Sequence, residues 1–145
     1  MNHKLVGFLI FLASILSTQA SADFQVNTYT TDYQSSPALG VDSNGNFVVV
    51  WTSNGSNYGD LSDSSIQGQR FTSNGSFINS QFQVNTYTTG SQSGCDVGID
   101  NEGDFVVVWH DLNGNYSIQA QRFASDGSYS GSQFQVNEDT SDYKY

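Results

Sequence analysis

The chain has 145 residues, of which 12% are charged, with 14 Asp and Glu against four Lys and Arg. This length allows one ordinary domain. The formal charge of −10 excludes binding to nucleic acid or to an anionic membrane by charge. The single cysteine excludes an intramolecular disulfide, and also a zinc site of four cysteines or of two cysteines and two histidines.

The first 22 residues have the pattern of a secretory signal peptide. One cation, Lys4, precedes the apolar run 5–16, and Ala-Ser-Ala at 20–22 follows. The apolar run is shorter than the roughly 20 residues that a membrane-spanning helix needs. A buried core helix is the alternative interpretation. We expect a secreted, extracellular or cell-surface protein, or a periplasmic one, with no membrane span in the mature part 23–145.

An internal repeat is the clearest feature of the mature part. FQVNTYTT and FVVVW each occur twice, and so does IQxQRF. The aligned segments are 24–53 with 82–111, and 66–85 with 118–137. Of their 50 positions, 32 are identical, which indicates a tandem duplication. The repeats differ in length between Trp51 and Ile66, so that stretch is expected to be a loop.

Each repeat predicts four short strands joined by turns. In the first repeat these are 38–42, 47–52, 65–72 and 77–85, with Asn-Gly turns between pairs. FVVVW does not alternate, which indicates a strand buried on both faces. The small residues Gly68 and Ala120 predict close approach of a neighbouring sheet.

The predicted fold class is all-β, with antiparallel four-stranded repeats that are similar to β-propeller blades. A β-sandwich is the alternative, and it would require the strands of the two repeats to interleave. Two blades are fewer than the four to eight of a propeller, so we expect a piece of a longer array or closure into a ring by self-association. The predicted divisions are a signal peptide (1–22), a lone strand and linker (23–36), a first repeat (37–93), a second repeat (94–137) and the truncated start of a third (138–145).

The pattern Gly-x-Asp, Asn-Gly, FVVVW, IQxQRF, Ser-x-Gly-Ser, FQVNT resembles the tandem propeller-like repeats of large secreted bacterial surface proteins. The likeness covers 24–145. Such repeats often accompany calcium-binding or adhesin modules, so the resemblance implies a scaffold or an adhesive surface.

Asp100, Glu102 and Asp104 are the candidate metal ligands. Their i, i+2, i+4 spacing places three carboxylates in one turn, and calcium draws six to eight oxygens from such segments. The matching turn at Asp42 has one carboxylate and is a weaker candidate. The alternative is a hairpin turn built from residues that tolerate left-handed backbone.

Cys95 and His110 form the one conceivable nucleophile–base pair. If the Asp100 turn closes a hairpin, residues whose numbers sum to about 204 face each other. Cys95 is then opposite Trp109, one step from His110. Against this reading, adjacent residues of a strand point to opposite faces, and the first repeat has Pro37 and Thr52 at these positions. We therefore predict that the protein is not an enzyme.

Arg70 and Arg122 occupy the same position in both repeats. Either they recognise a carboxylate ligand, or they form ion pairs within or between blades, with Asp42 and Asp100 as the expected partners. Their recurrence favours the structural role.

The aromatic residues divide into two groups. Trp51 and Trp109 end the predicted inner strands and are expected in the core. Tyr58 and Tyr116 lie in loops rich in Asn, Asp, Ser and Gly, a setting that suits sugar binding. The alternative is tyrosines that pack between blades.

Together these features predict a secreted or cell-surface, non-enzymatic repeat module. It would act as a scaffold or adhesive surface with calcium support, and with a glycan or a surface protein as partner. The alternative is a carbohydrate-binding lectin formed when several chains close one propeller.

Overall fold

The computed structural model describes residues 23–55, 63–113 and 116–138. The predicted signal peptide, Tyr58 and residues 139–145 lie outside these ranges. The described residues form strands and turns without a helix, and so they include no apolar helix of membrane-spanning length.

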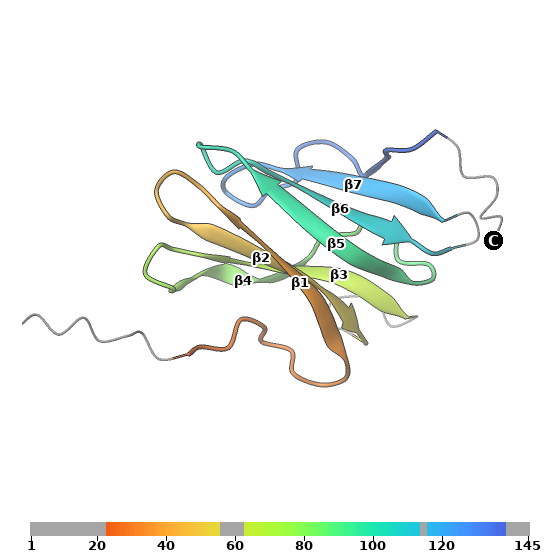
Figure 1. Ribbon diagram of the computed structural model, residues 1–145, viewed down its shortest axis with the longest axis horizontal. Coiled ribbons are helices and arrows are strands. Elements are labelled where there is room, and N and C mark those ends of the chain that lie inside the picture. Colours follow the sequence, from red (N-terminus) through yellow and green to blue (C-terminus); the bar gives the residue numbers. More distant parts are fainter. Residues whose placement is uncertain (1–22, 56–62, 114–115, 139–145) are drawn as a thin grey trace, which may run out of the picture.

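Each repeat folds into its own antiparallel sheet, with the four strands in chain order (Figure 1). Sheet A consists of β1 (Gln34–Val41), β2 (Phe47–Asn54), β3 (Ser64–Phe71) and β4 (Phe77–Gln83). Sheet B consists of β5 (Gln92–Ile99), β6 (Phe105–Asp111), β7 (Ser117–Phe123) and β8 (Phe134–Gln135). The two sheets lie one over the other, with β5 packed on β1, β2 and β3, and they do not close into a ring. The sandwich alternative would require the strands of the two repeats to interleave, and they do not.

The predicted Asn-Gly turns are confirmed. In the turn between β1 and β2 the Asp42 N–H donates to the Asn46 carbonyl at 2.9 Å, and Gly45 has a φ of 79°. Only glycine adopts this backbone conformation without steric cost. The turn between β3 and β4 has the same geometry around Gly75, whose φ is 84°.

The first strand of each sheet contains a bulge, and β1 begins at Gln34, four residues before its predicted start at residue 38. In β1 the register shifts between Ser35 and Ala38, and Ser36 has a φ of 52°. In β5 it shifts between Ser93 and Asp96. A bulge places two residues opposite one, so the period-two pattern of the strand is lost there. The irregular sequence before Ala38 therefore gave no strand signal.

Each sheet has two faces. The C-face looks toward the part of the chain that follows the sheet, and the N-face looks toward the part that precedes it. The C-face of sheet A looks toward sheet B and carries Val48, Val50, Ile66 and Val84. The N-face of sheet B meets it with Phe105, Val107, Trp109 and Phe123. All eight side chains are at most 4% exposed. Burial of one such side chain contributes about 1.5–3 kcal/mol, so this contact is the core of the molecule.

The prediction that FVVVW is buried on both faces is confirmed for one face in each sheet. In β2 Val48 is buried and Val49 is half-buried, whereas in β6 Val107 is buried and Val108 is half-buried. The fully buried side is the one that meets the other sheet.

The close approach predicted from Gly68 has a different origin. A Cβ at Gly68 would lie 2.7 Å from Cζ of Phe82, whose ring covers the glycine from the adjacent strand of the same sheet. A neighbouring sheet is therefore not what the small residue accommodates. In sheet B, Ala120 pairs with Phe134 at the same place.

Residues 23–33, predicted to include a lone strand, form no strand. Phe24 instead packs on Phe71, with ring centroids 5.4 Å apart. Phe82 packs on Phe123 at 5.5 Å in the same way. Phe24 thus covers the N-face of sheet A in the same way that Phe82 of β4 covers the N-face of sheet B.

Candidate functional site

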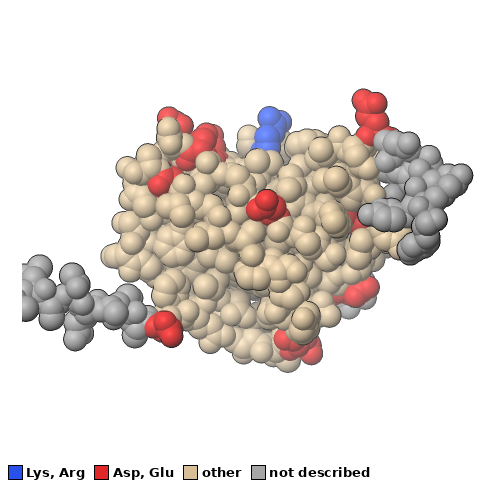
Figure 2. All heavy atoms as spheres, in the orientation of Figure 1, with Lys and Arg blue, Asp and Glu red and all other residues tan. Residues whose placement is uncertain are grey.

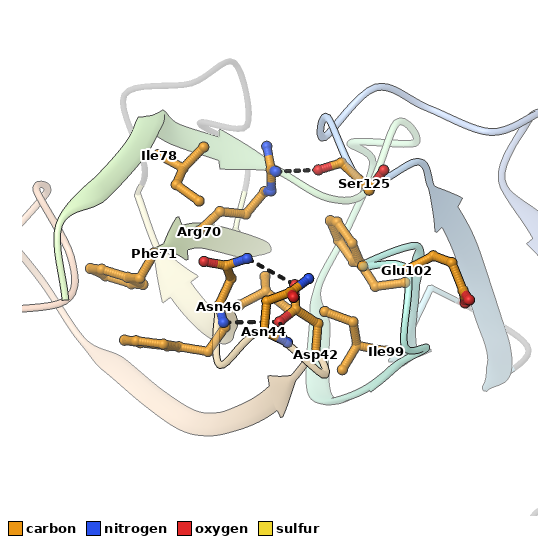
Figure 3. Close-up of a pocket in the computed structure, with 13 residues that line it drawn as sticks. Asp42, Asn44, Asn46, Arg70, Phe71, Ile78, Ile99, Glu102 and Ser125 are labelled. Atoms are coloured by element: carbon orange, nitrogen blue, oxygen red, sulfur yellow. Dashed lines mark hydrogen bonds between the residues drawn. The ribbon is translucent and has the colours of Figure 1, made fainter. Parts of the chain in front are cut away.

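A crevice of about 130 Å³ opens between the hairpin ends of the two sheets (Figure 3). Its polar lining consists of Asp42, Asn44, Asn46, Arg70, Glu102 and Ser125. Its apolar lining includes Phe47, Phe71, Ile99 and Phe105. Both repeats contribute, so the crevice exists only because the sheets are packed together.

Arg70 crosses this crevice from β3 to the turn after β7. Its Nη1 donates to the Asp126 carbonyl at 2.7 Å, and its Nη2 donates to the Ser125 carbonyl. Burial lowers the pKa of Arg70 and the charge of Asp126 opposes this, but a guanidinium stays protonated in either case. The expected partners were Asp42 and Asp100. The structure instead gives Arg70 backbone carbonyls of the next repeat, so it links the two repeats.

Arg122, the equivalent residue of sheet B, is exposed. Its guanidinium carbon lies 5.8 Å from the centroid of the Phe134 ring, in a cation–π contact within its own sheet. Identical residues in the two repeats therefore have different partners.

The Asp42 carboxylate is held within its own turn. Oδ1 accepts hydrogen bonds from the N–H groups of Asn44 (2.8 Å) and Asn46 (2.9 Å), and Oδ2 accepts one from Nδ2 of Asn46 (3.0 Å). The bond from the Asn46 side chain is the main reason that the pKa of Asp42 lies below its ordinary value. Asp42 is thus a charged group that stabilises the turn.

Two of the three predicted metal ligands, Asp100 and Asp104, likewise accept hydrogen bonds from backbone N–H groups. Asp100 Oδ1 accepts from the N–H groups of Glu102 (3.0 Å) and Asp104 (2.9 Å), and Asp104 Oδ1 accepts from the Ser125 N–H (2.8 Å). In Figure 3 the Glu102 side chain points away from the crevice. Across the described ranges, no three His, Cys, Asp or Glu side chains gather closely enough to hold a metal ion. Calcium binding at this turn stays a prediction from the sequence.

The predicted register around Cys95 holds only in part. Asp96 pairs with Val108, which agrees with a sum of 204, but Ser93 pairs with His110. Gly94 and Cys95 therefore share the position opposite Trp109, because the bulge begins there; the φ of Gly94 is 63°. A bulge of this kind is set by the backbone and has no signature in the residue numbers.

The Cys95 thiol lies in the core between the sheets and is 8% exposed. Its Sγ donates to the Ser36 carbonyl at 3.5 Å. Burial raises the pKa of Cys95 to about 11, so the thiol is protonated at neutral pH, whereas nucleophilic chemistry needs the thiolate. His110 is exposed to solvent on the same sheet. The geometry therefore does not activate Cys95.

Trp51 and Trp109 are both buried, but they differ in the hydrogen bonding of their indole N–H groups. Trp51 Nε1 donates to Gln34 Oε1 at 2.9 Å. Trp109 Nε1 has no hydrogen-bond partner among the described residues. Gln92, the equivalent of Gln34, is engaged elsewhere: its Oε1 accepts from Asn85 Nδ2 at 3.0 Å.

Of the two tyrosines proposed for sugar binding, only Tyr116 falls in the described residues. It is 54% exposed and lies just before β7, with a φ of 43°. Figure 2 shows a largely uncharged face with acidic side chains mostly near its rim, so charge does not mark a binding site there.

Two glutamines that the sequence analysis missed join the sheets to the linkers before them. Gln81 Oε1 accepts from the Thr28 N–H at 2.9 Å, while its Nε2 donates to Gln67 Oε1 at 3.3 Å. Gln133 Oε1 accepts from the Thr86 N–H at 2.9 Å. Because Thr86 follows sheet A, Gln133 ties the two repeats together. The recurrence of Ser-Gln-Phe-Gln-Val-Asn was the available signal, but it did not reveal the partner.

Comparison with protein-family models and with curated protein sequences identifies no relative. No protein-family model matches the chain, and no curated protein sequence is significantly similar to it. The chain is thus described by its two repeated four-stranded antiparallel sheets, without an assigned family.

Proposed function

We propose that the protein is a secreted or cell-surface, non-enzymatic repeat module that acts as a scaffold or adhesive surface. One observation carries this proposal: polar side chains of the repeated segments hold backbone together, at both copies of the glutamine and at one copy of the arginine. Arg70, Gln81 and Gln133 bond to backbone groups of neighbouring turns and linkers. Duplication of such residues preserves the stacking of repeats and does not by itself build a reactive site.

A stacked repeat suits a scaffold because it presents the same turns at regular intervals. The turns at Asn44 and Asn101 lie side by side, with Ser43 Oγ donating to the Asn101 carbonyl at 2.7 Å. Weak contacts to such turns would add up when several are engaged at once, as in multivalent binding.

Cell fractionation and mass spectrometry test the location. We expect the protein in the medium, on the cell surface or in the periplasm, with a mass that corresponds to removal of residues 1–22. Retention of the intact chain in the cytoplasm would overturn the proposed location.

Adhesion is tested separately, with beads that carry the purified protein and with beads that carry an unrelated acidic protein of similar size. We expect only the former to bind to the producing cells or to their extracellular matrix. Equal retention of both beads would remove the adhesive role.

A carbohydrate-binding role is the second candidate, and the crevice is the observation that favours it. The amides of Asn44 and Asn46 lie beside the rings of Phe47 and Phe71, a combination that suits sugar hydroxyls and apolar sugar faces. A glycan array tests it, with Asn44→Ala as the crevice variant and Asn74→Ala, in the other turn of sheet A, as control. Binding that is absent in the wild type, or equally strong in both variants, would exclude this site.

A further inference from the structure

The C-face of sheet B is exposed at positions whose counterparts in sheet A are buried. Ile118 is 38% exposed and its counterpart Ile66 is 0% exposed. Val136 is 52% exposed, whereas Val84 is 0% exposed. Phe134 adds a further exposed ring at 42%. An apolar surface of this kind on an otherwise polar chain marks an interaction site.

The structure itself shows what covers such a face. In sheet A the C-face is covered by the N-face of sheet B, with its two phenylalanines, valine and tryptophan. The N-face of sheet A repeats these residues one for one, as Phe47, Val49, Trp51 and Phe71. One chain therefore carries both halves of a contact that it already makes once internally.

We propose that the C-face of sheet B binds the N-face of sheet A of a second copy of this chain, head to tail. The contact would repeat the packing that joins sheets A and B within one chain. The inference goes beyond the scaffold role proposed above and does not depend on it, because it is argued from the matched faces alone.

A polar contact supports the same arrangement. Arg70 donates to the carbonyls of Ser125 and Asp126 in the turn that follows β7. The equivalent arginine, Arg122, is exposed beside the C-face of sheet B. In the docked pair Arg122 faces the turn of the second copy at residues 73–74, which is the equivalent of 125–126.

Two features of the chain oppose this contact and set its strength. Phe24 already lies on Phe71, in the place that Phe134 of another copy would take, so docking displaces the segment around Phe24. Asp96 stands where sheet A has Ala38, which packs against the core between the sheets. A carboxylate brought into such a contact loses hydration. Both features predict weak, concentration-dependent association.

An open hollow shows where docking would begin. It has a volume of about 180 Å³ and is lined by Val26, Pro37, Val49 and Trp51 beside the Phe24 segment. The counterpart of Pro37 in sheet B is Cys95, which is 8% exposed between the sheets. Pro37 thus occupies an N-face position, and because it is exposed in the single chain it can be changed there with little effect.

Sedimentation velocity on the purified protein, expressed from the full sequence, tests the proposal over a concentration range. Ile118→Glu changes the C-face of sheet B, and Pro37→Glu changes the N-face of sheet A. Leu112→Glu is the control, because Leu112 is 37% exposed but lies in the loop after β6. We expect the wild type and Leu112→Glu to associate equally, and the two face variants to stay monomeric. Circular dichroism checks that each variant is folded.

Mixing the two face variants gives the decisive result. Ile118→Glu retains an intact N-face and Pro37→Glu retains an intact C-face, so a head-to-tail contact predicts a one-to-one dimer in the mixture. A contact between two identical C-faces predicts instead that Pro37→Glu associates with itself and forms no one-to-one dimer with Ile118→Glu, and that result would overturn the proposal. Association of Ile118→Glu alone, at wild-type strength, would overturn it as well.

Two further variants test the opposing features. Asp96→Ala and Phe24→Ala should each strengthen association by about tenfold or more, while the Ile118→Glu change should abolish the gain. If the wild type and Asp96→Ala both remain monomeric at about 1 mM, where even millimolar affinities are detected, the proposal is wrong. No surface or glycan takes part in these measurements, so their failure is distinct from failure of the scaffold role.

Discussion

The two C-faces of this molecule have nearly the same sequence and opposite surroundings. Ile66 is buried against sheet B, whereas Ile118 is 38% exposed. Arg70 reaches the next repeat, whereas Arg122 remains beside Phe134 of its own sheet. The comparison teaches that a repeat encodes a surface that fits a neighbour, while the neighbour determines whether that surface becomes core.

The largest effect is expected where the two faces differ most. Ile66→Ala should lower the free energy of unfolding by about 2–5 kcal/mol, because it opens a cavity between the sheets. Ile118→Ala should lower it by less than about 1 kcal/mol in the monomer. Urea denaturation at low protein concentration measures both. Equal losses would mean that the two faces are not differently packed in solution.

Cys95 and its counterpart Pro37 extend the comparison to the N-faces. With a pKa of about 11 instead of 9.0, Cys95 should react with iodoacetamide at pH 8 about 100-fold more slowly than the same thiol in the urea-unfolded chain. Pro37→Cys, made in a Cys95→Ala background, should react nearly as fast as an unfolded thiol. Rapid labelling of Cys95 in the folded protein would contradict the buried placement.

The same pKa shift predicts a pH dependence of stability. Folding raises the pKa of Cys95, so the unfolded chain loses this proton first as the pH rises. The contribution to stability is complete below about pH 9 and is lost as the pH rises toward about 11. Denaturation curves at pH 8 and 10.5 measure it. In Cys95→Ala the part of the alkaline loss that is due to this thiol should disappear.

The arginine pair should differ more modestly. Arg70→Ala should cost about 1–2 kcal/mol, because it removes charged hydrogen bonds that are partly exposed to solvent. Arg122→Ala should change stability by less than about 0.5 kcal/mol, as is usual for an exposed side chain. Thermal unfolding of the two variants compares them directly, and a larger loss for Arg122→Ala would reverse the assignment of the linking arginine.

The smallest effect concerns the two glutamines and is local. Gln81→Ala should speed amide hydrogen exchange at Thr28 and leave Thr86 unchanged, while Gln133→Ala should do the reverse. Each variant removes the hydrogen-bond acceptor of one linker N–H and should lower the free energy of unfolding by about 1 kcal/mol. NMR-detected exchange measures both amides in one experiment. Exchange that rises at both amides in either variant would show that the linkers are not independently held.

Several features of the fold could be predicted from the sequence because they depend on near neighbours in the chain. The Asn-Gly turns require a backbone conformation that glycine adopts readily, and Gly45 and Gly75 have it. The apolar run of FVVVW predicted the central strand of each sheet, and the duplication predicted two separate sheets. The site was less predictable: Arg70 was expected to meet a carboxylate, and Gln81 was not considered.

The sequence by itself therefore determined the all-β repeats, their strand order and their turns, since turn geometry and periodicity are local properties. Only the tertiary structure decided where the bulges at Ser36 and Gly94 lie and which carbonyls Arg70 binds. It also decided which of two matching faces is buried. These outcomes depend on groups brought together from distant parts of the chain, and the same residues have different neighbours in each repeat. For this reason Ile66 lies in the core and Ile118 lies on the surface.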